Sequence, residues 1–119
     1  MPKTPPRILV IEDEALICML LEDVLEGLGC TVVGPAMTIE QGETLARAEA
    51  LQFAVLDVNL GRGDSFGVAD ILAARSVPFA FITGYGKAGV RKDLQGAPVL
   101  QKPIDIDRLE QILREHSIL

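Results

Sequence analysis

The sequence predicts an α/β fold in which a parallel sheet of five strands is covered by helices on both faces. The first indication is that short apolar runs alternate with longer segments whose apolar residues recur every three or four positions. The second is that the short runs are apolar throughout, as in strands buried on both faces. Strands and helices that alternate in this way are joined by right-handed crossovers, which makes the sheet parallel.

The expected elements follow one another without a repeat or a linker. The strands are predicted at residues 7–11, 31–34, 53–57, 79–83 and 98–101. The helices are predicted at residues 14–28, 39–50, 66–75 and after a capping Asp105, with residues 59–64 as a loop. Pro35 should end the second strand. Residues 84–96 hold four glycines, each costing a helix interior about 1 kcal/mol, so a further helix there should be short.

Length and composition indicate one domain, residues 1–119, with residues 1–6 disordered because their prolines prevent regular structure. The net charge of −6 disfavours direct binding to nucleic acid. No apolar run approaches the roughly 20 residues that span a bilayer, so we expect no membrane contact and a cytoplasmic location. The two cysteines, Cys18 and Cys30, are expected to be free thiols.

Five polar residues are expected to meet at one edge of the sheet. They follow or end four of the strands: Glu12, Asp13, Asp57, Thr83 and Lys102. In open α/β sheets, ligands bind at the carboxyl ends of the strands, which is where all five should lie. Each has an ordinary alternative when taken singly, because Asp13 could cap the next helix and Lys102 could be a surface charge. Their coincidence at one edge favours a site.

The charges in this group indicate a divalent cation. Three carboxylates within a few Å repel one another, and Lys102 supplies only one positive charge. A hard cation such as Mg²⁺, for which Mn²⁺ could substitute, would make the pocket neutral. A neutral pocket of this kind suits phosphoryl transfer to a carboxylate, and Asp57, at the end of a buried strand, is the best nucleophile. Thr83 and Lys102 could each pair with a phosphoryl oxygen.

This combination of residues resembles the receiver domain of two-component response regulators over almost the whole chain. The motif is made of Glu12-Asp13, Asp57, Thr83 and Lys102-Pro103. The resemblance implies a flavodoxin-like, CheY-like doubly wound sheet with the strand order 2-1-3-4-5 and about five helices. It also implies that the peptide bond between Lys102 and Pro103 is cis, as is common in the family.

The resemblance assigns a role to each matching residue. Asp57 would be the phosphoacceptor. The side chains of Asp13 and Asp57 and the backbone carbonyl of Asn59 would bind Mg²⁺, and Glu12 would act on the metal through water. Lys102 would pair with the phosphoryl group.

One position departs from the usual pattern. Receivers couple the switch hydroxyl, here Thr83, to a Tyr or Phe at the position that Val99 occupies. The stretch 78–86 instead resembles the FATGUY subgroup of receivers, which lacks that aromatic residue. Gly84 and Tyr85 would lie at the mouth of the site. Tyr85 could cover the site or replace the missing aromatic residue, or it could simply pack on its own loop.

The implied function is that of a signalling switch rather than an enzyme acting on a metabolite. A phosphohistidine on a histidine kinase or histidine phosphotransfer protein would supply the phosphoryl group. The new charge on Asp57 would then alter the surface at residues 83–104, which would bind a downstream protein target.

The first predicted helix has two faces with different expected roles. Its core face should carry Ile17, Leu20, Leu21, Val24, Leu25 and Leu28. Met19 lies opposite, with Leu16 and Cys18 beside it. Receivers meet kinases through this helix and the loop after the fifth strand, so Leu16, Met19 and Ile104 are the expected docking residues. An apolar stripe of this kind could instead be a dimer face.

Other functions are compatible with the same class of fold. A flavodoxin-like cofactor carrier would need a phosphate-binding loop where residues 12–14 are all acidic. A phosphatase with an aspartyl nucleophile would need a second acid at the position of Asn59. A degenerate receiver that serves only as a binding module would not need all five site residues.

Overall fold

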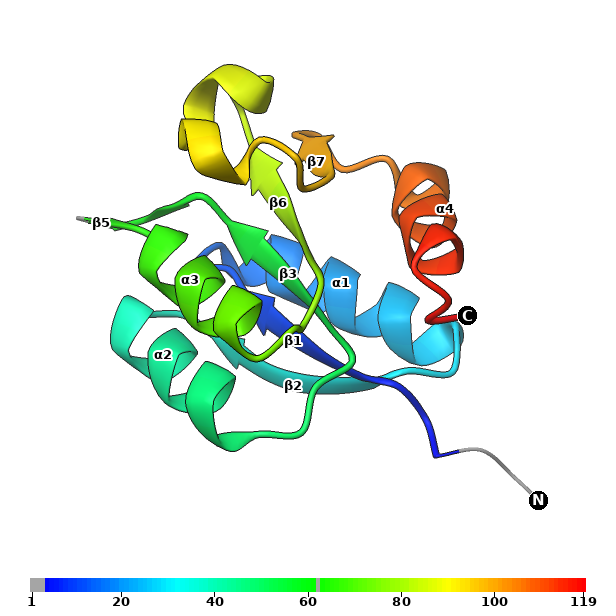
Figure 1. The fold of residues 1–119 in the computed structure, drawn as a ribbon. Coiled ribbons are helices and arrows are strands. Elements are labelled where there is room, and N and C mark those ends of the chain that lie inside the picture. Colours follow the sequence, from blue (N-terminus) through cyan, green and yellow to red (C-terminus); the bar gives the residue numbers. More distant parts are fainter. Residues whose placement is uncertain (1–3, 62) are drawn as a thin grey trace.

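The computed structural model describes residues 4–61 and 63–119, and the predicted sheet lies within these ranges. Its strands are β1 (Arg7–Ile11), β2 (Thr31–Ala36), β3 (Phe53–Asp57), β6 (Phe79–Thr83) and β7 (Val99–Gln101). They are arranged in the order β2-β1-β3-β6-β7, and all neighbouring pairs are parallel (Figure 1). This confirms the expected order. Because β1 and β3 lie inside the sheet, neighbouring strands on both sides hold their carboxyl ends in place.

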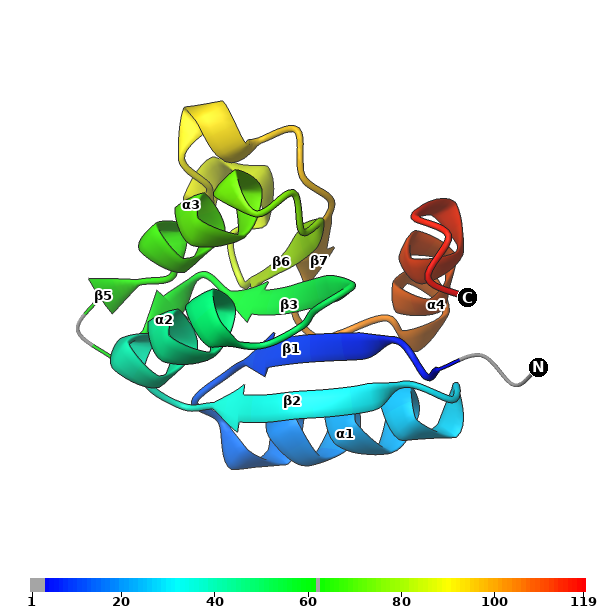
Figure 2. The ribbon, with the colours of Figure 1, turned by 60° about the horizontal axis from the view of Figure 1, so that its bottom comes forward.

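The described residues form four α-helices, which cover the sheet in pairs. One face carries α1 (Ala15–Gly27) and α4 (Ile106–Glu115), and the other carries α2 (Ile39–Ala48) and α3 (Phe66–Ala74) (Figure 2). Successive strand residues point to opposite faces, so Val10 and Val55 pack under α1 and α4, whereas Leu9 and Leu56 pack under α2 and α3. The sheet therefore has an apolar core on each side, as its uniformly apolar strands predicted.

Two local predictions are wrong. β2 does not end at Pro35 but continues to Ala36, with a cis Gly34–Pro35 peptide bond. Proline is tolerated there because β2 is an edge strand, and Gly34 has a φ of 97°, which favours glycine. The expected loop at residues 59–64 contains a short antiparallel pair, β4 (Asn59–Leu60) and β5 (Gly63–Asp64).

The two faces of α1 are rotated slightly from the predicted ones. Cys18 is only 6% exposed and lies on the buried face with Leu21 and Leu25, whereas Leu20 is 40% exposed. The spacing of three and four residues from Cys18 through Leu25 places the centre of the buried stripe away from Leu20. The thiol of Cys18 donates to the carbonyl of Glu12 at 3.2 Å, and both cysteines are free, as expected.

The glycine-rich segment 84–96 contains two 3₁₀ turns, η1 (Gly86–Gly89) and η2 (Lys92–Leu94), in place of a further α-helix. This agrees with the expectation that any helix here would be short. After β7 the chain enters α4, and the Asp105 carboxylate caps that helix by accepting the N–H groups of Asp107 and Arg108 at 3.0 and 3.3 Å.

The predicted disorder at residues 1–6 falls partly outside the described residues, which begin at residue 4. The carbonyl of Pro6 accepts the N–H of Thr31 at 2.8 Å, so this residue already lies against β2. Disorder of the remaining residues and a single domain over residues 1–119 stay predictions. Every helix in the described ranges is too short or too polar to cross a membrane.

Candidate functional site

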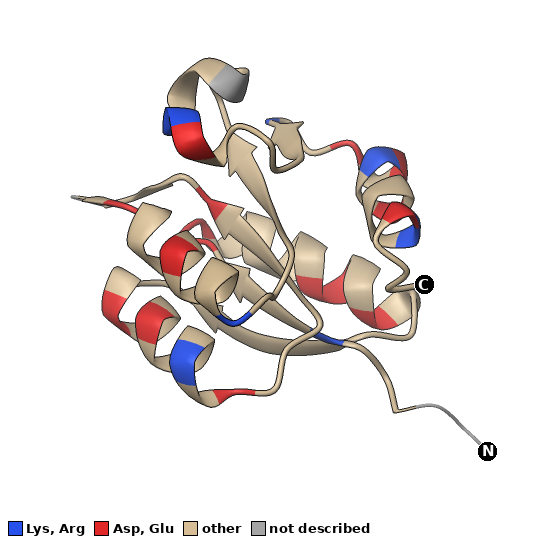
Figure 3. Ribbon diagram, viewed as in Figure 1, with Lys and Arg blue, Asp and Glu red and all other residues tan. Residues whose placement is uncertain are grey.

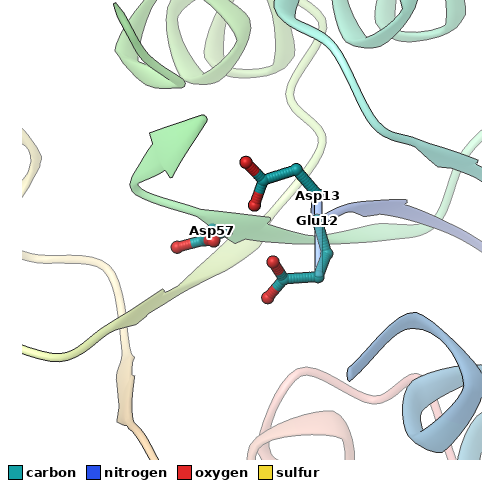
Figure 4. Close-up of side chains that lie close together, drawn as sticks. All are labelled: Glu12, Asp13 and Asp57. Carbon is teal, nitrogen blue, oxygen red and sulfur yellow. The ribbon is translucent and has the colours of Figure 1, made fainter. Parts of the chain in front are cut away.

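The carboxylates that follow β1 and β3 lie together at the carboxyl edge of the sheet. Glu12 and Asp13 come directly after β1, and Asp57 is the last residue of β3. Each offers a carboxylate oxygen, and these three oxygens lie within 4.8 Å of one another. Figure 4 shows the carboxyl groups of Glu12 and Asp13 on the side of β1 that faces Asp57. Glu12 and Asp57 are buried, while Asp13 reaches solvent.

Among the described side chains, Lys102 is the cation that faces these acids. Its backbone N–H donates to the carbonyl of Thr83 at 3.0 Å, which extends the pairing of β6 and β7 and directs the side chain toward the site. Its Nζ lies 3.3 Å from Oδ2 of Asp57 and 3.6 Å from Oε1 of Glu12. Burial by itself lowers the pKa of Lys102, but the charges of Asp57 and Glu12 outweigh burial and raise that pKa, so the amine stays protonated.

Glu12 is the least solvated of the acids. Its Oε2 accepts the N–H of Glu14 at 3.0 Å, but its Oε1 has no hydrogen-bond partner among the described residues. Burial, supported by the neighbouring Asp57 carboxylate, raises the pKa of Glu12 to about 7. A buried oxygen without a hydrogen bond, beside two further carboxylates, fits a cation that takes oxygen ligands, because the ion would satisfy and neutralise it. The residues present therefore fit the predicted divalent ion.

Thr83 ends β6 next to Ile82, the residue that pairs with Asp57 across the sheet. It is buried, and its Oγ1 accepts the N–H of Tyr85 at 3.0 Å, which leaves the hydroxyl proton for another acceptor. Beside it opens a cavity of about 550 Å³ lined by Asp13, Glu14, Asp57, Asn59, Gly61, Gly84, Tyr85 and Lys102. The fold thus brings Asp13, Asp57, Asn59, Lys102 and the predicted site-mouth residues Gly84 and Tyr85 to one cavity, whereas Glu12 is buried and does not line it.

Residues 8–114 match the family model of the response regulator receiver domain. The match includes β1 from Ile8 onward, the other four strands of the parallel sheet and every residue of the charged cluster. The chain belongs to this family. It is a receiver domain of two-component and phosphorelay signalling, as its residues predicted.

Two regulators with curated descriptions show how this receiver relates to longer proteins. The phyllosphere-induced regulator PhyR of Methylorubrum extorquens is 42% identical over 82 residues, which cover 66% of this chain and 31% of that protein. The transcriptional regulatory protein PdtaR of Mycobacterium tuberculosis is 29% identical over 109 residues, which cover 88% of this chain and 53% of that protein. The receiver therefore spans about a third to about half the length of these relatives.

Solved structures agree with the assignment. The solution structure of SdrG from Sphingomonas melonis Fr1 is 39% identical, has a TM-score of 0.84 and covers 98% of this chain and 99% of its own. The BeF₃-activated conformation of SdrG has a TM-score of 0.77 and covers 95% of this chain and 96% of its own. PhyR from Brucella abortus is 28% identical, with a TM-score of 0.81, and covers 96% of this chain and 48% of its own.

The predicted switch residues of the receiver differ in where they lie, and Val99 and Pro103 are not among the described residues that line the cavity. Tyr85 is 73% exposed and lines the cavity together with Gly84. Val99, at the position of the usual aromatic residue, is partly buried and packs against the core beneath α2 and α3. Pro103 is exposed, and the Lys102–Pro103 peptide bond is cis, as the resemblance implied.

The three predicted docking residues differ in exposure. On α1, Leu16 is 81% and Met19 61% exposed, and the helix carries acidic residues but no basic ones (Figure 3). Ile104 is partly buried against the core beneath α1 and α4, so only part of it is accessible. Cys18, expected beside Met19, is buried and does not contribute to this surface.

Sequence reasoning missed one residue of the site. The sequence places Glu14 at the start of a helix and in an acidic run, without a role at the site, yet its Oε1 lies 3.3 Å from Nζ of Lys102, and its side chain lines the cavity. The available signal was a third consecutive acid after the first strand. A side chain of this length at the first turn of a helix can reach back over the strand ends.

Proposed function

We propose that this receiver accepts a phosphoryl group on Asp57 from the phosphohistidine of a histidine kinase or a histidine phosphotransfer protein. The observation that carries the proposal is the position of Asp57, whose carboxylate lies close to both the Glu12–Asp13 pair and Lys102 and also lines an open cavity. Neither neighbouring acid combines these properties, because Glu12 is fully buried and Asp13 has no contact with Lys102 among the described residues.

Magnesium is the proposed cofactor, with Mn²⁺ as a possible substitute. The side chains of Asp13 and Asp57 and the carbonyl of Asn59 would hold the ion, with Glu12 acting through water. When bound, the ion neutralises the acids and the oxygens of the incoming phosphoryl group. This assignment is supported by the charge of the site, where one lysine faces several carboxylates.

The proposed transfer uses groups of the chain for charge and positioning. An oxygen of Asp57 forms the new P–O bond while the P–N bond to the donor imidazole breaks, and the imidazole leaves with the bonding electron pair. The ammonium of Lys102 pairs with a phosphoryl oxygen, which replaces part of its present contact with Asp57. The hydroxyl of Thr83, whose proton is free to be donated, turns to another phosphoryl oxygen.

Movement of the Thr83 side chain would couple phosphorylation of Asp57 to a change in segment 84–96. Its Oγ1 now accepts the N–H of Tyr85, so turning toward Asp57 breaks that bond and releases the start of segment 84–96. The surface at residues 83–104 would then bind a downstream protein, and the donor would dock on Leu16, Met19 and Ile104.

The proposal is tested by incubating the receiver with acetyl phosphate, with and without Mg²⁺, and measuring intact mass. We expect the wild type to gain one phosphoryl group only with the metal, and Asp57→Asn to gain none. The matched control is Asp64→Asn, which makes the same change at an exposed acid whose carboxylate accepts the N–H of Phe66 outside the cavity. Labelling of Asp57→Asn at the wild-type rate would refute the assignment.

A further inference from the structure

Glu14 is the acid at this site whose side chain has no evident use in the fold. It stands at the N-cap of α1, but its side chain makes no capping hydrogen bond within the described residues. The carboxylate, which is 60% exposed, turns instead to Lys102. Nζ of Lys102 lies 3.3 Å from the carboxylates of both Glu14 and Asp57. The ammonium is therefore shared equally between the exposed acid, Glu14, and the buried acid, Asp57.

The charge of Glu14 changes the electrostatics of the site. Together with Glu12, Asp13 and Asp57, it gives the cluster more negative charge than Lys102 and one divalent ion can neutralise. Glu14 also lines the cavity that opens onto Asp57, so a phosphodonor approaches Asp57 past its carboxylate. A charged cleft of this kind repels ligands of the same sign and lowers their rate of entry.

We propose that Glu14 is a specificity-determining residue that slows phosphorylation of Asp57 by small dianionic phosphodonors. Its charge repels the approaching dianion, and its contact with Lys102 competes with the phosphoryl oxygens for the ammonium. A donor protein is affected less, because it also gains contacts on the exposed apolar residues Leu16 and Met19 of α1. The inference rests on the proposed role of Asp57 as the phosphoacceptor.

The test compares two donors of different charge: acetyl phosphate, a dianion near neutral pH, and phosphoramidate, a monoanion. Labelling rates are measured by intact mass for the wild type, Glu14→Gln, Glu14→Asp and Glu26→Gln, at low and high salt. The last variant removes the same charge from the exposed far end of α1. Folding of each variant is checked by circular dichroism.

We expect Glu14→Gln to accelerate labelling by acetyl phosphate about three- to tenfold at low salt, with a much smaller gain for phosphoramidate. High salt should reduce the gain because it screens the charge. Glu14→Asp should keep the wild-type preference between donors, and Glu26→Gln should match the wild type.

Two results would overturn the inference while leaving Asp57 as the phosphoacceptor. One is a labelled wild type with an unchanged acetyl phosphate rate in Glu14→Gln, and the other is an equal gain for both donors. A wild type that takes no label from either donor would instead refute the proposed function, and the inference with it.

Discussion

The acids of the site and the segment that covers Thr83 are held in place in opposite ways. Glu12, Asp13 and Asp57 are attached to β1 and β3, which lie inside the sheet and are almost entirely buried. Segment 84–96 has only two 3₁₀ turns, and among its described side chains only that of Val90 is buried. Among the described residues, we therefore expect the carboxylate of Asp57 to belong to a more stable region than segment 84–96.

Mainly exposed contacts hold the segment. Arg91 forms ion pairs of 2.6 Å with Asp70 of α3 and with Asp93, and its guanidinium lies 5.8 Å from the ring centre of Phe66. Ion pairs exposed to solvent stabilise a fold only weakly. We therefore expect that segment 84–96 can rearrange without disturbing Asp57, the carboxylate that would receive the phosphoryl group.

The largest expected effect comes from removing one apolar side chain from β3 and one from segment 84–96, to compare the stability of the two regions. Leu56→Ala, in β3, should lower the free energy of unfolding by about 3 kcal/mol, whereas Val90→Ala should cost about 1 kcal/mol. Urea denaturation measures both values. Amide hydrogen exchange should then quicken in segment 84–96 of the Val90 variant while β1 and β3 keep their protection. Equal loss of protection in β3 would mean that the two regions unfold as one unit.

A second test concerns Glu12, whose carboxyl group is buried directly after β1. Folding raises the pKa of Glu12 from 4.5 to about 7, so the folded state holds this proton more tightly than the unfolded state. The stabilisation is fully present below pH 4.5 and is lost as the pH rises through about 7. With a chelator present, the wild type should therefore lose on the order of 2–3 kcal/mol over this range.

Glu12→Gln should remove this dependence, because the amide does not titrate. Denaturant unfolding at several pH values measures the slope of each variant, and Mg²⁺ should restore wild-type stability at pH 8 but change the Gln variant less. An identical slope in both proteins would show that another group is responsible.

Much of the fold could be predicted because its causes are local to the sequence. The uniformly apolar runs at residues 7–11 and 53–57 allow few structures other than buried parallel strands, whereas the order of the strands in the sheet follows from the resemblance to receiver domains. The carboxyl ends of such strands share an edge, which predicts that Asp57 lies beside Glu12, and the structure has the two carboxylates together.

The missed features depend on contacts that periodicity does not encode. Pro35 continues β2 because that strand is at the edge of the sheet, and edge position is a property of the assembled fold. Leu20 is partly exposed because the buried face of α1 is centred on Cys18, Leu21 and Leu25. Glu14 contacts Lys102, which is 88 residues away in the sequence, so only the closed fold reveals the pairing.

The smallest expected effect tests how closely the segment fits over Thr83. A Cβ added at Gly89 would lie 3.2 Å from Oγ1 of Thr83, which ends the buried strand β6, and 3.3 Å from Cβ of Tyr85. Gly89→Ala should therefore push η1 outward and quicken amide exchange there, with a net loss of stability of about 0.5 kcal/mol or less.

Gly96→Ala is the matched control, because a Cβ at that position has no neighbour within 4 Å. It should leave exchange in η1 unchanged and raise stability slightly, since alanine restricts the unfolded chain more than glycine does. The difference between the two variants, about 1 kcal/mol, isolates the contact with Thr83 from the general cost of glycine. If both variants behaved alike, segment 84–96 would not pack closely against the hydroxyl of Thr83, and its mobility would be independent of Thr83.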